Sequence, residues 1–432
     1  MLIALGFYNS RIAIVTLICL AALVGLALFY NVRAFVVWIL PLVFLVADNR
    51  FYAVILMIIL AGLLAERLSS HKMTLDFPYV LWVGLLLAAG LNGMFRGVDR
   101  GGAQYFFVFS LAFPILLFLL IYNLNLSLQQ IRTFLFVVSI VVAVLGFISL
   151  AQYFATHIGR VIFRWDSQNP AACVFGMIIP FSLISMLDCE SRDERIGMGI
   201  ILLGVMAALF VTQTRAVLVS SLVGVTYIAM ADRRVLKVML PGLLLAGVAA
   251  PGLIVYRIAM FLGHGDTPDW SAVGRIDIWM NSLKFIPKYF WFGMGLDSFR
   301  HLYPANFPLA FQPKAEHPHN IFLRWLFDYG FFGLVAYTVL IALILWVGLR
   351  VAKQTSETTD AKGKRLLLAI NAGIISALIA NLFDSTMANA LVANLFWLFL
   401  AILLTSSRHL SLLNRKTEGF LSPVAISTGP SR

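Results

Sequence analysis

The sequence predicts an all-α, polytopic integral membrane protein, and two observations support this fold class. Of its 432 residues, 61% are hydrophobic and only 12% are charged, about half the charged share of an ordinary soluble domain. The apolar residues gather in many runs of roughly 20 residues, which is the length that crosses a bilayer as a helix. Helices also satisfy their own backbone hydrogen bonds, as a segment in lipid requires.

The apolar runs predict about twelve transmembrane helices. The first three runs, near 12–30, 34–47 and 51–65, include short ones, so two of them are expected to form one hairpin or tilted pair. The other spans are predicted near 77–94, 104–122, 131–156, 170–187, 196–213, 216–231, 235–259, 321–349, 366–384 and 388–405. No clear internal repeat divides the chain, so we expect one transmembrane domain over residues 1–416 and a disordered cytoplasmic tail over 417–432.

The net charge of +12 is read as an indication of topology rather than of nucleic-acid binding. Lys and Arg favour the short cytoplasmic loops of membrane proteins. Basic clusters alternate with the later spans, at Arg192/Arg195, Arg233/Arg234/Lys237, Arg350/Lys353/Lys362/Lys364/Arg365 and Arg408/Arg415/Lys416. This alternation puts the C-terminus in the cytoplasm, and with twelve spans the N-terminus as well. The large loop over residues 260–320 then lies on the outer, periplasmic side.

The 260–320 loop contains an amphipathic stretch at 274–288. Its apolar residues Ile276, Trp279, Leu283 and Ile286 recur on one helical face. A helix with such a face lies favourably on a membrane surface. We therefore expect short helices in this loop, with one of them resting against the bilayer.

Arginines gather on the outer face, where the topology rule places few of them. They are Arg164 before Asn169-Pro170, Arg215 at the end of Thr212-Gln213-Thr214, Arg275, and Arg300, with Lys284, Lys288 and Lys314 on the same side. A guanidinium stays charged and binds phosphate through paired hydrogen bonds, so these arginines predict an anionic ligand. For any single arginine the alternative is snorkelling to lipid headgroups, and for the lysines a solvated surface is the simpler interpretation.

The segment Glu316-His-Pro-His-Asn320 closes the loop at the start of the next span and has three interpretations. A neutral imidazole is suited to act as a general base, and His319 would be held more rigidly than His317 because it adjoins the helix. Alternatively, His319 and Asn320 cap the helix. A metal site with Glu316 is the third interpretation, but the sequence shows no further ligand cluster and no Asp-x-Asp motif.

The helix after this segment carries its own polar and small residues. Arg324 and Asp328 are four residues apart on one face and are expected to neutralise each other. Gly330 and Gly333 permit close packing of neighbouring helices. The three cysteines are scattered along the chain, which predicts neither a disulfide framework nor a metal cluster.

Taken in order, these motifs resemble the O-antigen ligase family, membrane proteins that share a Wzy-type C-terminal domain. The family pattern is His-Asn-x-x-Leu, then an acidic residue, then Gly-x-x-Gly. It is matched by His319, Asn320, Leu323, Asp328, Gly330 and Gly333, with Asp328 where the family usually has Glu. Further matches are Thr212–Arg215, Gly274-Arg275 with Trp279, Gly293 and Gly295 with Phe299, and Asn169-Pro170. The motifs cover about residues 165–335.

This resemblance implies a glycosyltransferase of the multispanning GT-C type in the bacterial inner membrane, acting in lipopolysaccharide biosynthesis. Such ligases move a glycan from undecaprenyl diphosphate to a hydroxyl of lipid A–core oligosaccharide on the periplasmic face, without a metal or other cofactor. It implies His319 as the base, Arg215 and Arg275 as stabilisers of the diphosphate, and inversion by direct attack. Other expected substrate-binding residues are Arg300, Arg164, His317, Asn320, Gln213 and Thr214.

Several alternatives stay open. An O-antigen polymerase would use the same donor with a second lipid-linked glycan as acceptor, and a third member type glycosylates proteins but carries a large C-terminal extension that this chain lacks. A flippase or anion carrier belongs to a different class. The central segments are nearly free of charge and the polar residues concentrate at one face, which favours chemistry at an interface. We expect a monomer in contact with membrane lipids and with no nucleic-acid partner.

Overall fold

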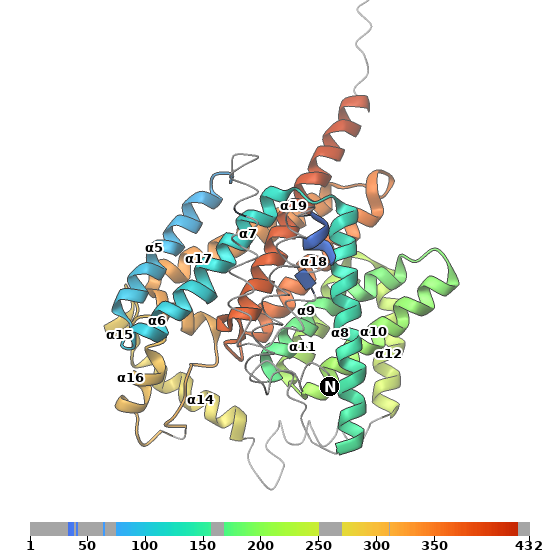
Figure 1. Ribbon diagram of the computed structural model, residues 1–432. Coiled ribbons are helices and arrows are strands. Elements are labelled where there is room, and N and C mark those ends of the chain that lie inside the picture. The colour runs from blue at the N-terminus through green and yellow to red at the C-terminus, as the bar shows by residue number, and fades with distance from the viewer. Residues whose placement is uncertain are drawn as a thin grey trace, which may run out of the picture.

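The computed structural model describes residues 33–38, 40–41, 64, 75–156, 168–249, 270–310 and 312–421. Within these residues the protein is all helical, without a strand, and eight of the helices are long and apolar enough to cross a membrane (Figure 1). The predicted fold class, an all-α polytopic membrane protein, is confirmed. The predicted spans near 12–30, 34–47 and 51–65 lie almost wholly outside the described residues.

From the fourth span onward the helices follow the predicted order. The long ones are α5 (Tyr79–Arg96), α6–η1–α7 (Arg100–Phe107, Val108–Ala112, Phe113–Leu124), α8 (Leu128–Thr156), α9 (Gln168–Leu187), α10 (Arg192–Thr212), α17 (Ile321–Gln354), α18 (Glu357–Ala380) and α19 (Ala390–Leu421). The shorter α11 (Arg215–Ala231) and α12 (Arg233–Ala249) occupy the next two predicted positions. Helix α19 continues to Leu421, into the predicted tail, and residues 422–432 lie outside the described part.

Helix α19 forms the centre of the bundle. Its apolar stretch is buried along its whole length, whereas α5, α8 and α10 leave much of their surface uncovered. Trp397 of α19 donates a hydrogen bond through Nε1 to the Tyr337 hydroxyl of α17 at 2.9 Å, and its ring packs edge-on against Phe118 of α7. A buried indole N–H needs such a partner in an apolar interior. The uncovered apolar surfaces of the outer helices suit contact with lipid.

Helix α17 is kinked at Gly330, which has φ 73° and ψ −176°. The kink releases two backbone groups, and the loop segment 290–294 supplies their partners. The Met294 N–H donates to the Phe327 carbonyl, and the Phe331 N–H donates to the Phe290 carbonyl, both at 2.7 Å. A Cβ atom at position 330 would lie 2.3 Å from the Trp291 carbonyl oxygen. Gly330 therefore allows a loop to pack against a broken helix, while Gly333 serves the predicted helix packing, against Ala89 of α5.

The described part of the large loop, from residue 270 on, contains three short helices, α14 (Trp270–Leu283), α15 (Ile286–Tyr289) and α16 (Phe299–Asn306). In Figure 1 they lie at the lower left, away from the end where α19 projects. Their apolar side chains form a small core with Phe327 of α17, made of Ile278, Phe285, Met294, Phe299, Tyr303 and Ala315. The expected apolar face of α14 is exposed at Ile276 and Leu283, together with Val273 and Met280. Its contact with a membrane surface stays a prediction.

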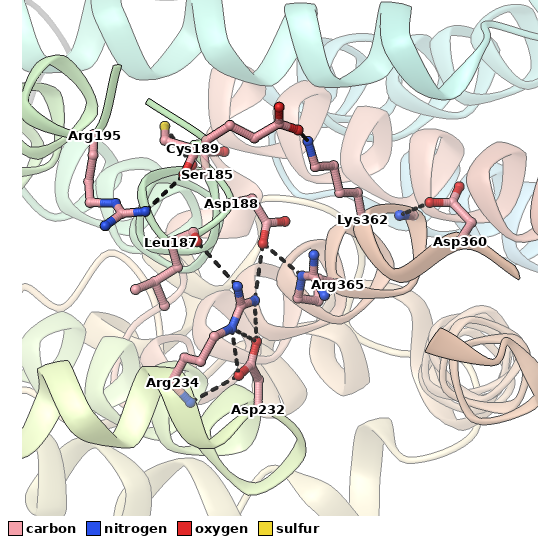
Figure 2. A network of polar contacts seen from close by, with 12 residues as sticks. Ser185, Leu187, Asp188, Cys189, Arg195, Asp232, Arg234, Asp360, Lys362 and Arg365 are labelled. Carbon is pink, nitrogen blue, oxygen red and sulfur yellow. Dashed lines mark hydrogen bonds and ion pairs between the residues drawn. The ribbon is translucent and has the colours of Figure 1, made fainter. Parts of the chain in front are cut away.

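Four of the basic residues that predicted cytoplasmic loops, Arg195, Arg234, Lys362 and Arg365, lie close together among polar contacts (Figure 2). Arg234 binds Asp232 and Asp188 at 2.6 and 3.0 Å, and Arg365 binds Asp188 at 2.8 Å. Nearby, Lys362 pairs with Glu190. This network, referred to below as the inner-end network, joins the loop after α9, the turn between α11 and α12, and the start of α18.

Replacing Gly330 is expected to destabilise the protein. Gly330→Ala puts a side chain into a backbone region that is essentially reserved for glycine, which costs about 1–3 kcal/mol, and also presses against the Trp291 carbonyl. The matched control is Gly84→Ala in α5, because a Cβ at position 84 meets nothing within 4 Å. Thermal unfolding in detergent should show a lowered melting temperature for Gly330→Ala alone. Equal melting temperatures for the two variants would contradict this account of the kink.

Candidate functional site

The start of α17 is fixed to the end of α18 by a set of asparagine contacts. The Asn320 side chain caps α17, because its Oδ1 accepts from the N–H groups of Phe322 and Leu323 at 3.0 and 3.1 Å. Its Nδ2 donates to the Leu382 carbonyl at 2.9 Å. The Ile321 N–H donates to the Asn381 carbonyl, also at 2.9 Å. The capping interpretation of the sequence thus applies to Asn320, and the imidazole of His319 is left for other contacts.

His319 faces an acidic residue that the sequence analysis did not select. Its Nδ1 lies 3.5 Å from Oδ1 of Asp384, in the connection between α18 and α19. His319 has φ 47°, a left-handed backbone conformation uncommon for residues other than glycine. Such strained positions often occur at functional sites. Asp384 stands at the edge of the predicted span 366–384, and a carboxylate at that depth was the signal that could have identified it.

The Asp384 carboxylate is held by two groups besides His319. Its Oδ1 accepts from the Ser385 N–H at 2.7 Å, and its Oδ2 accepts from Nδ2 of Asn169 at 2.5 Å. Burial raises the pKa of Asp384, but the two nearby imidazoles and the Ser385 N–H outweigh it and lower the pKa to about 2. The site therefore contains a fixed negative charge beside His319 at neutral pH.

His317 packs against His319, with the two ring centroids 4.1 Å apart. Burial lowers the pKa of His317 to about 3, and the nearby charges of His319, Arg324 and Arg275 act in the same direction while Asp384 opposes them. His317 is therefore neutral at neutral pH. The positive charges of Arg275 and Arg324 are thus close enough to His317 to act on its imidazole.

The predicted Thr-Gln-Thr-Arg turn is connected to the same place through Asn169. Gln213 ends α10 with φ 51°, and Thr214 precedes α11, whose first residue is Arg215. The Thr214 hydroxyl donates to Oδ1 of Asn169 at 3.3 Å. Asn169, in the first turn of α9, thus bonds Thr214 with one side-chain atom and Asp384 with the other. Three motifs that are distant in the sequence thus converge near the start of α9, the start of α11 and the end of α18.

Helix α14 packs against the loop that carries His317 and His319. The Trp279 indole donates to the Pro318 carbonyl at 2.9 Å, and its ring lies 6.4 Å from that of Phe383. Trp279 therefore departs from the predicted membrane-facing set and holds the loop that carries the histidines. Arg275, one turn earlier on α14, is half-buried.

The remaining expected residues are distributed differently. Arg300 pairs with Asp99 and Asp297 at 2.9 and 2.6 Å, which ties α16 to the turn between α5 and α6. Arg324 and Asp328 form the predicted pair, with Nε 3.1 Å from Oδ2. Arg164 lies outside the described residues. The substrate-binding roles of Arg300, Gln213, Thr214 and Asn320 stay predictions.

Some of these residues could hold a metal ion. His317, His319 and Asp384 each offer a ligand atom, and these atoms lie within 4.8 Å of one another. Histidine nitrogens and a carboxylate oxygen are donors that zinc and similar ions accept. Asp384, rather than the Glu316 that the sequence analysis considered, completes this set, and the metal interpretation stays open beside the base. Asp99, Asp297 and His301 form a second such group, where the guanidinium of Arg300 pairs with both carboxylates.

Comparisons with known proteins bear on the central part of the chain. Residues 199–338 match the family model described as O-Antigen ligase, which confirms the resemblance drawn from the motifs. The matched segment runs from α10 into α17 and contains Thr214, Arg215, Arg275 and His319, whereas Asn169 and Asp384 lie outside it. The match supports a function of the O-antigen ligase or polymerase type in a multi-pass membrane protein. The comparison with curated proteins gave no match.

Two substitutions at Asn320 separate a capping role from a substrate-binding role. Asn320→Ala removes the cap of α17 and is expected to cost about 1 kcal/mol of stability. Asn320→Asp keeps the capping oxygen but loses the Nδ2 hydrogen bond to the Leu382 carbonyl, so its melting temperature should fall less than that of Asn320→Ala. If Asn320 acts only as a cap, transfer activity should follow stability and survive in the aspartate variant. Loss of activity in a stable Asn320→Asp protein would assign the amide to substrate binding.

Proposed function

Because residues 199–338 carry the O-antigen ligase match, we propose that this protein is an O-antigen ligase of the bacterial inner membrane. It transfers a glycan from undecaprenyl diphosphate to a hydroxyl of lipid A–core oligosaccharide on the periplasmic face. The observation that carries this proposal is the His319–Asp384 contact, next to the turn that bears Arg215. A base and a cationic group at one interface suit a transfer whose leaving group is a diphosphate.

His319 serves as the general base. Its Nδ1 faces the Asp384 carboxylate at 3.5 Å, so Nε2 is the nitrogen that accepts the proton of the acceptor hydroxyl. The hydroxyl oxygen forms a bond to the anomeric carbon while the bond from that carbon to the phosphate oxygen breaks, which inverts the configuration. The ionised Asp384 orients the ring and stabilises the imidazolium that forms. A positioned base of this kind contributes about 10²–10⁴-fold to a rate.

Arg215 and Arg275 stabilise the diphosphate that leaves. The negative charge on its oxygens grows as the glycosidic bond breaks, and preorganised cations in a partly dehydrated site act most strongly on such developing charge. Arg215 is the first residue of α11, where the helix dipole adds partial positive charge. Arg275 comes from α14 beside the histidines, and its charge acts on His317.

A polymerase remains the second candidate, because it would use the same donor chemistry and differ only in its acceptor. The deciding assay uses purified protein, undecaprenyl-diphosphate-linked glycan and lipid A–core, with and without EDTA. We expect glycan transfer to lipid A–core that EDTA leaves unchanged. Elongation of the lipid-linked glycan without transfer to lipid A–core would identify a polymerase, loss of activity with EDTA would favour the metal interpretation, and no reaction at all would favour a transporter.

Substitutions at His319 and Asp384 test the assignment of the base. His319→Ala is expected to lower kcat by about 10²-fold or more, and Asp384→Asn should lower kcat with little effect on the KM of the donor. The matched control is His301→Ala, an exposed histidine of α16, which should keep full activity. Wild-type rates in His319→Ala would show that another group accepts the proton.

A further inference from the structure

One more arginine lies beside the site, one turn into α17. The Arg324 N–H donates to the Asn320 carbonyl at 3.0 Å, so Arg324 follows the His319-Asn320 corner directly. Its side chain is only 10% exposed, and its Cζ lies 5.0 Å from the centre of the Phe106 ring. A cation over an aromatic face is held in place without using its hydrogen-bond donors.

The hydrogen-bonding capacity of Arg324 is largely unused. A guanidinium carries five N–H donors. Within the described residues, the side chain of Arg324 donates only through Nε, to Oδ2 of Asp328 at 3.1 Å. The forked end, Nη1 and Nη2, has no partner there. Neither nitrogen is among the fully enclosed polar atoms that lack a partner, so both keep some accessible surface.

Mutual neutralisation alone does not explain this geometry. A pair that only neutralises two buried charges gains most from two parallel hydrogen bonds between the guanidinium fork and the carboxylate. Here the Nε bond to Asp328 offsets part of the cost of burying the charge, and the fork itself stays available. Fork geometry is also what distinguishes arginine from lysine in binding phosphate oxygens.

The surroundings show where Arg324 acts. Its guanidinium packs over the Phe106 ring of α6, and its partner Asp328 lies one turn further along α17, where its backbone approaches Gly93 of α5. The Arg324 guanidinium therefore lies on the side of α17 that faces α6, one helical turn from the His319-Asn320 corner.

We propose that Arg324 is a further donor-binding residue, whose terminal nitrogens bind the diphosphate oxygens of the lipid-linked glycan from the α17 side of the site. The identity of the donor rests on the proposed function. The chemistry recognised, a lipid-linked diphosphate, can be tested without any transfer reaction. An anionic phospholipid headgroup offers similar oxygens and is distinguished by competition.

The test measures affinity for undecaprenyl diphosphate on the full-length protein in nanodiscs. Arg324→Met with Asp328→Leu removes both charges together and leaves no unpaired buried charge, so this double variant is expected to fold. It should bind undecaprenyl diphosphate about tenfold more weakly or worse, while its melting temperature stays near that of the wild type. The control is Arg96→Met, an exposed arginine at the outer end of α5, which should bind within twofold of the wild type.

Arg324→Lys serves if the double variant does not fold. It keeps a charge beside Asp328 but lacks the fork, so it should weaken diphosphate binding severalfold. Unchanged affinity in either folded variant would overturn the proposal. Equal displacement of the diphosphate lipid by phosphatidylglycerol would also overturn it, because Arg324 would then contact headgroups. Wild-type binding that depends on Arg324 without any glycan transfer would support this inference while contradicting the proposed function.

Discussion

The hydrogen bonds of the buried residue Asn381 hold together the two chain segments that carry His319 and Asp384. Its Oδ1 accepts from the Thr386 hydroxyl and the Met387 N–H, and its Nδ2 donates to the Ala377 carbonyl. These bonds close the tight connection between α18 and α19 that presents Asp384. The backbone carbonyl of the same residue receives the first N–H of α17. In a low-dielectric interior a fully satisfied polar group of this kind specifies one arrangement of its neighbours.

Backbone hydrogen bonds also attach the loop before α17 to the membrane helices. The kink at Gly330 lets segment 290–294 complete the hydrogen bonds of α17, and Leu296 donates its N–H to the Gly93 carbonyl of α5 at 2.9 Å. The loop helices thereby pack on two membrane helices instead of extending freely from them. This explains how the long loop before α17 can hold the Arg275 and Trp279 side of α14 against the histidines.

Local features were predictable from the sequence, and long-range partners were not. Apolar run lengths predicted the spans from the fourth onward, and the Thr-Gln-Thr-Arg and His-Asn motifs predicted the helix ends near Gln213 and Asn320. Asp384 was missed because it closes an apolar run, and only tertiary packing brings it to His319. The ion pair of Arg300 with Asp99 was missed for the same reason, since nothing local in the sequence links residues so far apart.

The inner-end network has a consequence for the site at the opposite ends of the same helices. The three elements that it clamps are the loop after α9, the turn after α11 and the start of α18. At their other ends, the helices α9, α11 and α18 lie next to or carry Asn169, Thr214 and Asp384. A helix is stiff over the roughly 30 Å of a bilayer core, so a change of tilt at one end moves the other. The ion pairs at one end of these helices therefore help to fix the spacing of Asn169, Thr214 and Asp384 at the other end.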